Sequence, residues 1–191
     1  MSAISIIDKN SARLIKLAII YLLLLTGVVI FAEKAIYKNS SMSEPIGYYL
    51  ALPGMPVHAG DLVLTCITNN EYKHVFNELG LKDLPGECSN GLPYLIKRIV
   101  AASGDKVEVV KAGILINSNL YLNSKQFTEG RGIKLNPLPV GYSHVLSEDE
   151  YFMLGNSTHS VDSRYFGVIK KNDIYRRAIL IYEGFIPAKK G

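Results

Sequence analysis

The sequence predicts a mainly β domain attached to a single membrane-spanning helix, and three observations lead to that prediction. The first is an uncharged apolar run from residue 17 to residue 32. The second is a series of short apolar or alternating segments that follows the run and is separated by turn residues. The third is a hydrophobic content of 48 % in 191 residues, high for a soluble domain and concentrated in the apolar run. This length fits one domain with its own core plus an appendage.

The apolar run is long enough to cross a bilayer. With Leu14 and Ile15 added, and with Lys16 reaching toward the headgroups, residues 14–32 form a helix of about 28 Å, which spans the hydrocarbon layer. A cleaved secretory signal is the alternative. However, the run is longer than a usual signal core, and no small-x-small site follows before Glu33. We therefore expect an uncleaved anchor in contact with membrane lipid.

Charges before the anchor predict its orientation. Three positive charges, Lys9, Arg13 and Lys16, stand against Asp8, a balance of +2. By the positive-inside rule, the tail of residues 1–13 stays in the cytoplasm. Residues 33–191 then form an extracytoplasmic, periplasmic domain anchored in the inner membrane. The net charge of +4 leaves +2 for this domain without a basic stripe, so nucleic acid is not an expected partner.

The segments after the anchor have the period and length of strands, and one has the period of a helix. We expect strands over residues 48–52, 62–67, 94–101, 106–110, 113–116, 151–154 and 177–182. One amphipathic helix is expected over residues 70–79, with Tyr72, Val75, Phe76 and Leu79 on one face. No repeat or low-complexity segment interrupts this β-rich domain.

The two cysteines, Cys66 and Cys88, both lie in the domain expected outside the cytoplasm. In an oxidising compartment such a pair predicts a disulfide, which would close a loop of about 22 residues around the expected helix. No His or Cys stands at ligand spacing to either cysteine, so a metal site is not expected.

Ser43 is the candidate nucleophile. Pro45 restricts its own backbone and that of Glu44, and Gly47 permits a tight turn, so the segment around Ser43 is stiff. In an extended segment Ser41 points to the same side, where its hydroxyl and the Ser43 N–H form a candidate oxyanion hole. Taken alone, these serines are better explained as an ordinary polar loop after a membrane helix.

Lys97 is the candidate base. On a strand, Leu95, Lys97 and Ile99 share one face, so two large aliphatic neighbours remove water from the amine. Burial lowers the pKa of a lysine, and a neutral amine can take the proton of a serine. The alternative is an ordinary charged Lys97-Arg98 pair on an edge strand.

A polar loop over residues 155–167 supplies supporting residues. We expect Asp162 and Arg164 to form an ion pair that braces the site, and Ser163 to hydrogen-bond the lysine amine. His159 suggests a Ser-His-Asp triad, but a Ser–Lys dyad needs no histidine. We interpret His159 as a surface loop residue.

Four blocks in these segments resemble the S26 signal peptidase family. They are Ser43-Glu44-Pro45, Gly60-Asp61 before a strand, Lys97-Arg98 running on to Gly104-Asp105, and Asp162-Ser163-Arg164-Tyr165-Phe166-Gly167. Within the family the chain is more similar to TraF-type conjugative transfer peptidases than to signal peptidase I. The x-Pro-x-Gly-x-Tyr after the serine, the cysteine-bounded insert and the ending Arg177-Ala178-Ile179-Leu180-Ile181-Tyr182 favour this subgroup. Ala102-Ser103, where a proline is common, and Gly155-Asn156 depart from the signal peptidase I pattern without touching Ser43 or Lys97.

The resemblance implies a β-fold of the signal peptidase and LexA kind, with its active site near the membrane surface and no cofactor. It implies Ser43 as nucleophile, Lys97 as general base and Ser41 as oxyanion donor, with Asp162 and Arg164 as the brace. The family cleaves exported precursors after small residues. TraF-type members mature the conjugative pilin subunit, in some systems joining its new C-terminus to its N-terminus.

Two other functions stay open at this stage. A general type I signal peptidase would release many secreted proteins by the same chemistry, although residues 111–146 leave little room for the large second domain of many such enzymes. A non-catalytic, membrane-anchored scaffold of a secretion complex would require the Ser43–Lys97 pairing to be accidental.

Overall fold

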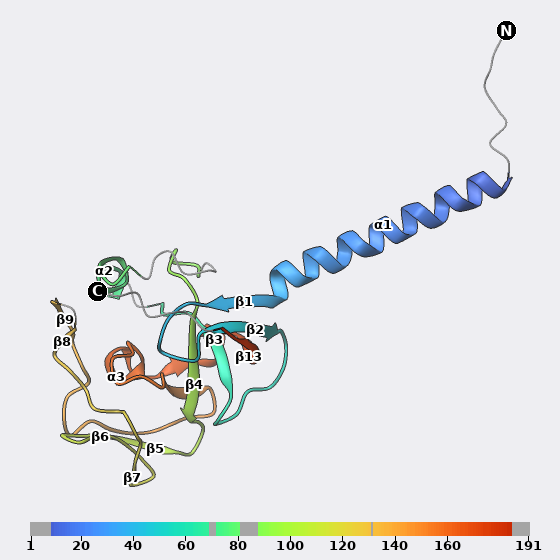
Figure 1. Cartoon of the computed structure of the whole chain (residues 1–191). Helices are drawn as coiled ribbons and strands as arrows, with labels where there is room; N and C mark the ends of the chain where they lie inside the picture. The colour runs from blue at the N-terminus through green and yellow to red at the C-terminus, as the bar shows by residue number, and fades with distance from the viewer. Residues whose placement is uncertain (1–8, 69–71, 81–87, 131, 185–191) are drawn as a thin grey trace. The chain divides into compact units, whose positions relative to one another are not determined.

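The computed structural model describes residues 9–68, 72–80, 88–130 and 132–184. Contacts within the chain divide it into two compact units, residues 1–36 and residues 37–191. The described part of the first unit is helix α1 (Lys9–Ala35), and that of the second is a mainly β domain (Figure 1). The predicted fold class, a β domain with one N-terminal apolar helix, is confirmed.

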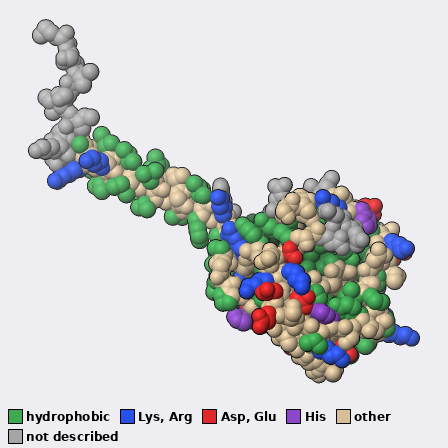
Figure 2. Space-filling model, turned by 180° about the vertical axis from the view of Figure 1, so that it is seen from behind, with side chains coloured by type: hydrophobic (Ala, Val, Ile, Leu, Met, Phe, Trp, Pro, Cys, Tyr) green, Lys and Arg blue, Asp and Glu red, His purple; other side chains and the backbone are tan. Residues whose placement is uncertain are grey.

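Helix α1 has the composition of a membrane span. Its 27 residues are about 40 Å long, and the stretch Ser11–Ala32 has a mean hydropathy of 2.6 with none of its most apolar window buried in the protein. Figure 2 shows hydrophobic side chains along most of the helix and Lys or Arg side chains toward its two ends. The predicted anchor, residues 14–32, lies within this stretch, and residues 1–8 of the predicted tail lie outside the described residues.

The β domain contains one large sheet and two small ones. The large sheet has the strand order β1-β2-β13-β3-β4-β11-β12, and Figure 1 shows its central strands side by side. Its strands are β1 (Ile36–Asn39), β2 (Gly47–Leu52), β3 (Leu62–Thr65), β4 (Leu95–Ala101), β11 (Glu150–Leu154), β12 (Ile169–Lys170) and β13 (Ile174–Glu183). Strand β4 lies between β3 and β11, with Val63 opposite Lys97 and Met153 opposite Ile99, both antiparallel. The alternative reading, a charged Lys97-Arg98 pair on an edge strand, is therefore wrong.

The smaller elements surround this sheet. A four-stranded sheet has the order β10-β5-β6-β7, and β8 pairs with β9. These strands are β5 (Lys106–Val110), β6 (Gly113–Ile116), β7 (Asn119–Leu120), β8 (Glu129–Gly130), β9 (Ile133–Lys134) and β10 (Ser143–Val145). The remaining helices are α2 (Lys73–Glu78), α3 (Ser163–Phe166) and the 3-10 helix η3 (Lys171–Asp173).

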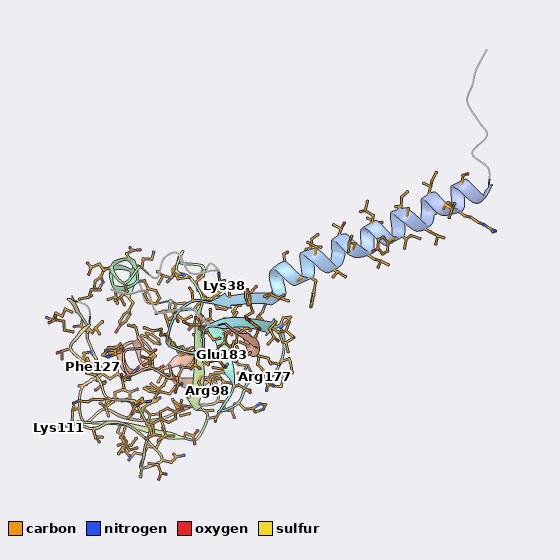
Figure 3. The ribbon with its side chains drawn as sticks, viewed as in Figure 1. Lys38, Arg98, Lys111, Phe127, Arg177 and Glu183 are labelled. Atoms are coloured by element: carbon orange, nitrogen blue, oxygen red, sulfur yellow. A yellow bond between two sulfur atoms is a disulfide. The ribbon has the colours of Figure 1, made fainter. Side chains whose placement is uncertain are left out.

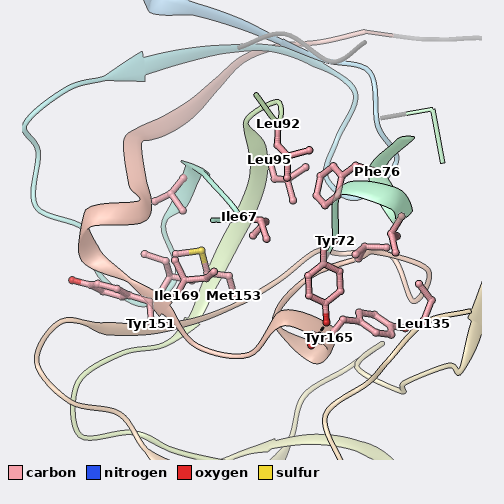
Figure 4. Packing of buried hydrophobic residues seen from close by; sticks show 14 of the residues in the cluster. Ile67, Tyr72, Phe76, Leu92, Leu95, Leu135, Tyr151, Met153, Tyr165 and Ile169 are labelled. Carbon is pink, nitrogen blue, oxygen red and sulfur yellow. Dashed lines mark hydrogen bonds between the residues drawn. The ribbon is translucent and has the colours of Figure 1, made fainter. Parts of the chain in front are cut away.

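The largest core cluster joins helices α2 and α3 to the large sheet. Val75 and Phe76 of α2 are buried in it together with Leu95 and Ile99, the two neighbours that were expected to flank Lys97. Figure 4 shows Tyr72 beside Tyr165, whose carbonyl accepts a hydrogen bond from the Tyr72 hydroxyl at 2.6 Å. The apolar face predicted for residues 70–79 is thus confirmed where the structure describes it, and residues 70 and 71 lie outside the described residues.

The predicted disulfide is present. Cys66 follows β3 and Cys88 precedes β4, with their Cα atoms 5.7 Å apart and 22 positions between them in sequence. The bond closes the loop that carries α2. It thereby ties α2 to the two strands that flank the loop.

Candidate active site

Ser43 lies in the turn between β1 and β2, and Asn39 organises this turn. The Asn39 side chain is buried, and its Nδ2 donates to the carbonyl oxygens of Ser41, Glu44 and Pro45, each at 3.0 Å. Its Oδ1 accepts from the backbone N–H of Ser41 at 3.1 Å. One amide side chain therefore fixes the backbone on both sides of Ser43. The sequence analysis did not identify this residue.

The Ser41 and Ser43 side chains meet, as predicted. Their Oγ atoms lie 3.3 Å apart, and the Ser41 hydroxyl lies 3.1 Å from Asn39 Oδ1, which accepts a hydrogen bond from it. The segment is a turn, so the two hydroxyls come together without the extended conformation that the sequence analysis considered. The backbone carbonyl of Ser43 accepts from the Asn156 N–H at 2.6 Å, which joins this turn to the loop after β11.

Lys97 is buried in the centre of the large sheet, with 2 % of its surface exposed. Burial lowers the pKa of its amine to about 8, while the carboxylates of Asp162 and Glu44 oppose that shift and Arg164 adds to it. The Nζ atom donates to Ser160 Oγ at 3.0 Å. About a tenth of this amine is therefore neutral at pH 7, a far larger fraction than in an exposed lysine.

Ser160, and not Ser163, bonds the lysine amine. The Ser163 hydroxyl instead accepts a hydrogen bond from the Met153 N–H at 3.0 Å, inside the protein. Ser163 begins α3, so its side chain is directed toward β11. The expectation for Ser163 is thus corrected, and no signal in the sequence separated Ser160 from the other serines of the loop.

The ion pair predicted between Asp162 and Arg164 is present and fully buried. Arg164 Nε and Nη2 bond the two carboxylate oxygens of Asp162 at 2.8 and 2.7 Å. Asp162 also accepts from the backbone N–H groups of Gly155 and Arg164. The remaining guanidinium donors bond the carbonyl oxygens of Asn123, Lys125, Ser157, Thr158 and Ser160. This pair therefore holds the loop that presents Ser160 to Lys97.

A cavity of about 640 Å³ opens beside these residues. Ser41, Ser43 and Ser160 line it, and its apolar lining residues are Met42, Leu79, Phe127, Leu135, Val161 and Tyr165. His159 lines it as well and stacks on Phe127 with ring centroids 5.3 Å apart; Figure 3 labels Phe127. His159 is exposed, as predicted. The arrangement places the Ser43 hydroxyl on the same cavity as Ser160, which accepts the hydrogen bond of the buried Lys97 amine.

Comparison with known proteins identifies the family. The sequence model described as "Signal peptidase, peptidase S26" matches residues 10–183. The chain belongs to the S26 signal peptidase family. The predicted resemblance is therefore confirmed, and the peptidase class that it implied for this chain is supported.

Similar S26 relatives carry the name TraF. A "Plasmid transfer protein TraF" of Escherichia coli is 31 % identical over 158 residues, which cover 80 % of this chain and 84 % of the relative. A "Conjugal transfer protein TraF" of Agrobacterium fabrum (strain C58) is 28 % identical over 151 residues, covering 77 % and 82 %. A signal peptidase I of Enterococcus faecalis aligns in structure with a TM-score of 0.35 and 16 % identity, over 64 % of this chain and 97 % of that one.

Proposed function

We propose that this S26 family member is a Ser–Lys endopeptidase in which Ser43 is the nucleophile and Lys97 is the general base. The observation that carries the proposal is the buried Lys97 amine, with its pKa lowered to about 8, bonded to a serine that lines the same cavity as Ser43. A general base works best when its pKa lies near the working pH. Among the lysines whose burial the structure describes, Lys97 is the one that is buried.

In the proposed reaction, neutral Lys97 takes the proton of Ser43 Oγ as the hydroxyl attacks the scissile carbonyl carbon. The C–N bond then breaks, the leaving amine takes the proton from Lys97, and an acyl ester remains on Ser43. Water, activated by the same amine, hydrolyses the ester. The hydrogen bond described for Lys97 Nζ goes to Ser160 Oγ. Catalytic contacts are often completed only when substrate binds, and the proposal requires the amine to reach Ser43 Oγ in that complex.

The developing negative charge on the carbonyl oxygen needs preorganised donors. The Ser41 hydroxyl, 3.3 Å from Ser43 Oγ, and the Ser43 N–H are the proposed pair. Asn39 supports them, because it fixes the backbone of the turn that carries both groups.

The proposed substrate is an exported precursor protein, and specifically the pilin subunit of a conjugation or type IV secretion system. The names of the relatives, a plasmid transfer and a conjugal transfer protein, favour this class of precursor over secreted proteins in general. The proposed orientation has the N-terminus in the cytoplasm, α1 in the inner membrane and the catalytic domain in the periplasm.

Mass spectrometry of a co-expressed pilin precursor tests the function. The wild-type chain should shorten the precursor at one site, while Ser43→Ala and Lys97→Ala should leave it intact. Ser41→Ala should slow processing by roughly 10²–10³-fold, the usual loss for one oxyanion donor. Ser143→Ala and Lys111→Ala, at exposed positions, serve as matched controls that process normally.

A secreted protein with an ordinary signal peptide is the second substrate in the same assay. Cleavage of this protein at a rate equal to that of the pilin precursor would favour a general signal peptidase. Cleavage of neither precursor by the wild type would favour the scaffold, and full activity of Ser43→Ala would remove Ser43 as the nucleophile.

A further inference from the structure

Glu44, the residue after Ser43, is a buried acid with unusual surroundings. Only 3 % of its surface is exposed, and neither carboxylate oxygen has a hydrogen-bond partner of good geometry, although the backbone N–H of Asn156 lies near enough to lower the pKa of this carboxyl. A buried carboxylate without hydrogen bonds is costly, because its hydration has been lost and not replaced. The fold alone therefore gives no reason for an acid at this position.

Arg98 is the cation nearest to this carboxylate. Its Nη2 lies 3.6 Å from Glu44 Oε2, and its Nη1 donates to the Gly60 carbonyl at 2.7 Å. The Arg98 side chain is 39 % exposed, so water and Gly60 satisfy it even without Glu44. Figure 3 labels Arg98 on β4, the strand that also carries Lys97.

Each of the two charged residues directly follows one residue of the proposed dyad. Glu44 directly follows Ser43, and Arg98 directly follows Lys97. We propose that Glu44 is a positioning residue whose carboxylate, paired with Arg98, holds the segment of the nucleophile against the strand of the base and maintains a negative charge close to the Lys97 amine. This role rests on the proposed function of Ser43 and Lys97.

The charges around Lys97 support an electrostatic part of the role. Burial has the largest effect on the Lys97 amine and lowers its pKa. Asp162 and Glu44 raise this pKa, and Arg164 lowers it. Asp162 has the larger effect of the two carboxylates, and Arg164, which it bonds twice, offsets that effect only in part. Arg98, which matches Glu44, is partly in water and screened by it.

Burial and the surrounding groups act on Glu44 in opposite directions. Burial raises the pKa of Glu44, and Asp162 raises it further, whereas Arg98, Lys97 and the backbone N–H of Asn156 lower it and favour the carboxylate. The other titratable groups that sense Glu44 are the phenols of Tyr49 and Tyr121, and its charge raises the pKa of each. Both phenols thus stay neutral at the pH where Lys97 titrates and add no charge of their own.

The test uses the full-length protein in detergent and measures precursor processing against pH for the wild type, Glu44→Gln and Glu44→Asp. Glutamine keeps the volume and removes the charge. The acid limb of kcat/KM should then move to lower pH by about half a unit or more, because an anion that raises the pKa of Lys97 is gone. The plateau should fall by roughly 3–10-fold from the lost ion pair, and Glu44→Asp should return the limb to its wild-type position.

Thermal melting separates this role from a structural one. Glu44→Gln should melt no lower than the wild type, since the change removes a buried charge and leaves Arg98 solvated. Glu148→Gln, an exposed acid without a described ion pair, is the control for net charge and should match the wild type in both assays.

The outcomes separate the two proposals. Three results for Glu44→Gln would overturn the role of Glu44: the protein fails to fold, it melts clearly lower, or it keeps the wild-type acid limb. If Ser43→Ala is inactive in the same experiment, the Ser–Lys proposal remains standing. If Ser43→Ala still processes the precursor, the dyad is wrong and the Glu44 proposal ends with it. A shifted acid limb, unchanged melting and restoration by aspartate support the positioning role.

Discussion

Lowering the pH should switch off precursor processing by charging Lys97. Burial lowers the pKa of this amine to about 8, and only the neutral amine can accept the proton of Ser43. The neutral fraction falls about tenfold for each pH unit below the pKa. The value of kcat/KM at pH 7 should therefore be about a tenth of its plateau, and at pH 6 about a hundredth.

The lowered pKa of Lys97 also makes the free energy of unfolding depend on pH. Between pH 8 and the ordinary lysine pKa of 10.5, the unfolded chain binds a proton at Lys97 that the folded chain does not, so the free energy of unfolding rises with pH in this window. Below pH 8 the buried amine is charged and lowers the free energy of unfolding by about 3 kcal/mol, and this full penalty is present at neutral pH. Lys97→Met removes this penalty, so the variant should be inactive and should melt roughly 5–10 °C higher at pH 7.

Initial rates on a purified precursor from pH 5.5 to pH 9.5, with melting curves of the wild type and Lys97→Met, provide the measurement. Lys97→Arg is the control for charge and should be inactive, because a guanidinium stays protonated. A processing rate that is flat from pH 6 to pH 9, or activity in Lys97→Arg, would refute Lys97 as the base. A Lys97→Met protein that melts lower would refute the assigned desolvation cost.

Two further predictions concern the surroundings of the site. Ser160→Ala removes the hydrogen-bond acceptor of Lys97 and should lower kcat roughly 5–15-fold with little change in melting temperature. Ser163→Ala leaves the buried Met153 N–H without its acceptor and should lower the melting temperature with little change in kcat. Equal effects of the two substitutions on kcat would contradict the geometry. Replacing both Cys66 and Cys88 by serine opens a 22-residue loop and should lower the free energy of unfolding by about 3 kcal/mol, measured by chemical denaturation. Activity per folded molecule should change less than in the Ser43 variant, and two free thiols in alkylated wild-type protein would contradict the bond.

The sequence was sufficient for the long, periodic elements of this chain. The span within α1, the strands β2 to β6, β11 and β13, and the buried face of α2 follow from apolar spacing alone, and the disulfide follows from the count of two cysteines. Strand β13 is longer than predicted, since it starts at Ile174 to pair with β3 as well as β2. Strands of two residues such as β7, β8, β9 and β12 carry no period, because their partners across the sheet determine them.

The site was predicted unevenly for a similar reason. Lys97 was recognisable because its neighbours along a strand are apolar, and local spacing fixes those neighbours. Ser160, Asn39 and Glu44 acquire their roles through contacts that depend on the path of two separate loops. No local pattern distinguishes a serine that bonds a buried amine 63 residues away from one that faces water.

Leu79 and Gly80, which line the cavity, belong to the loop closed by Cys66 and Cys88 and not to the sheet that carries Lys97. Part of the cavity wall is thus formed by a loop that the disulfide closes and that begins and ends at the large sheet. Val75 and Phe76 of the loop are core residues, but substitutions at the less buried Leu79 and Gly80 alter the shape of the cavity at little cost to the sheet. Evolution can therefore change which precursor is accepted within this loop, while the reacting groups remain under independent selection.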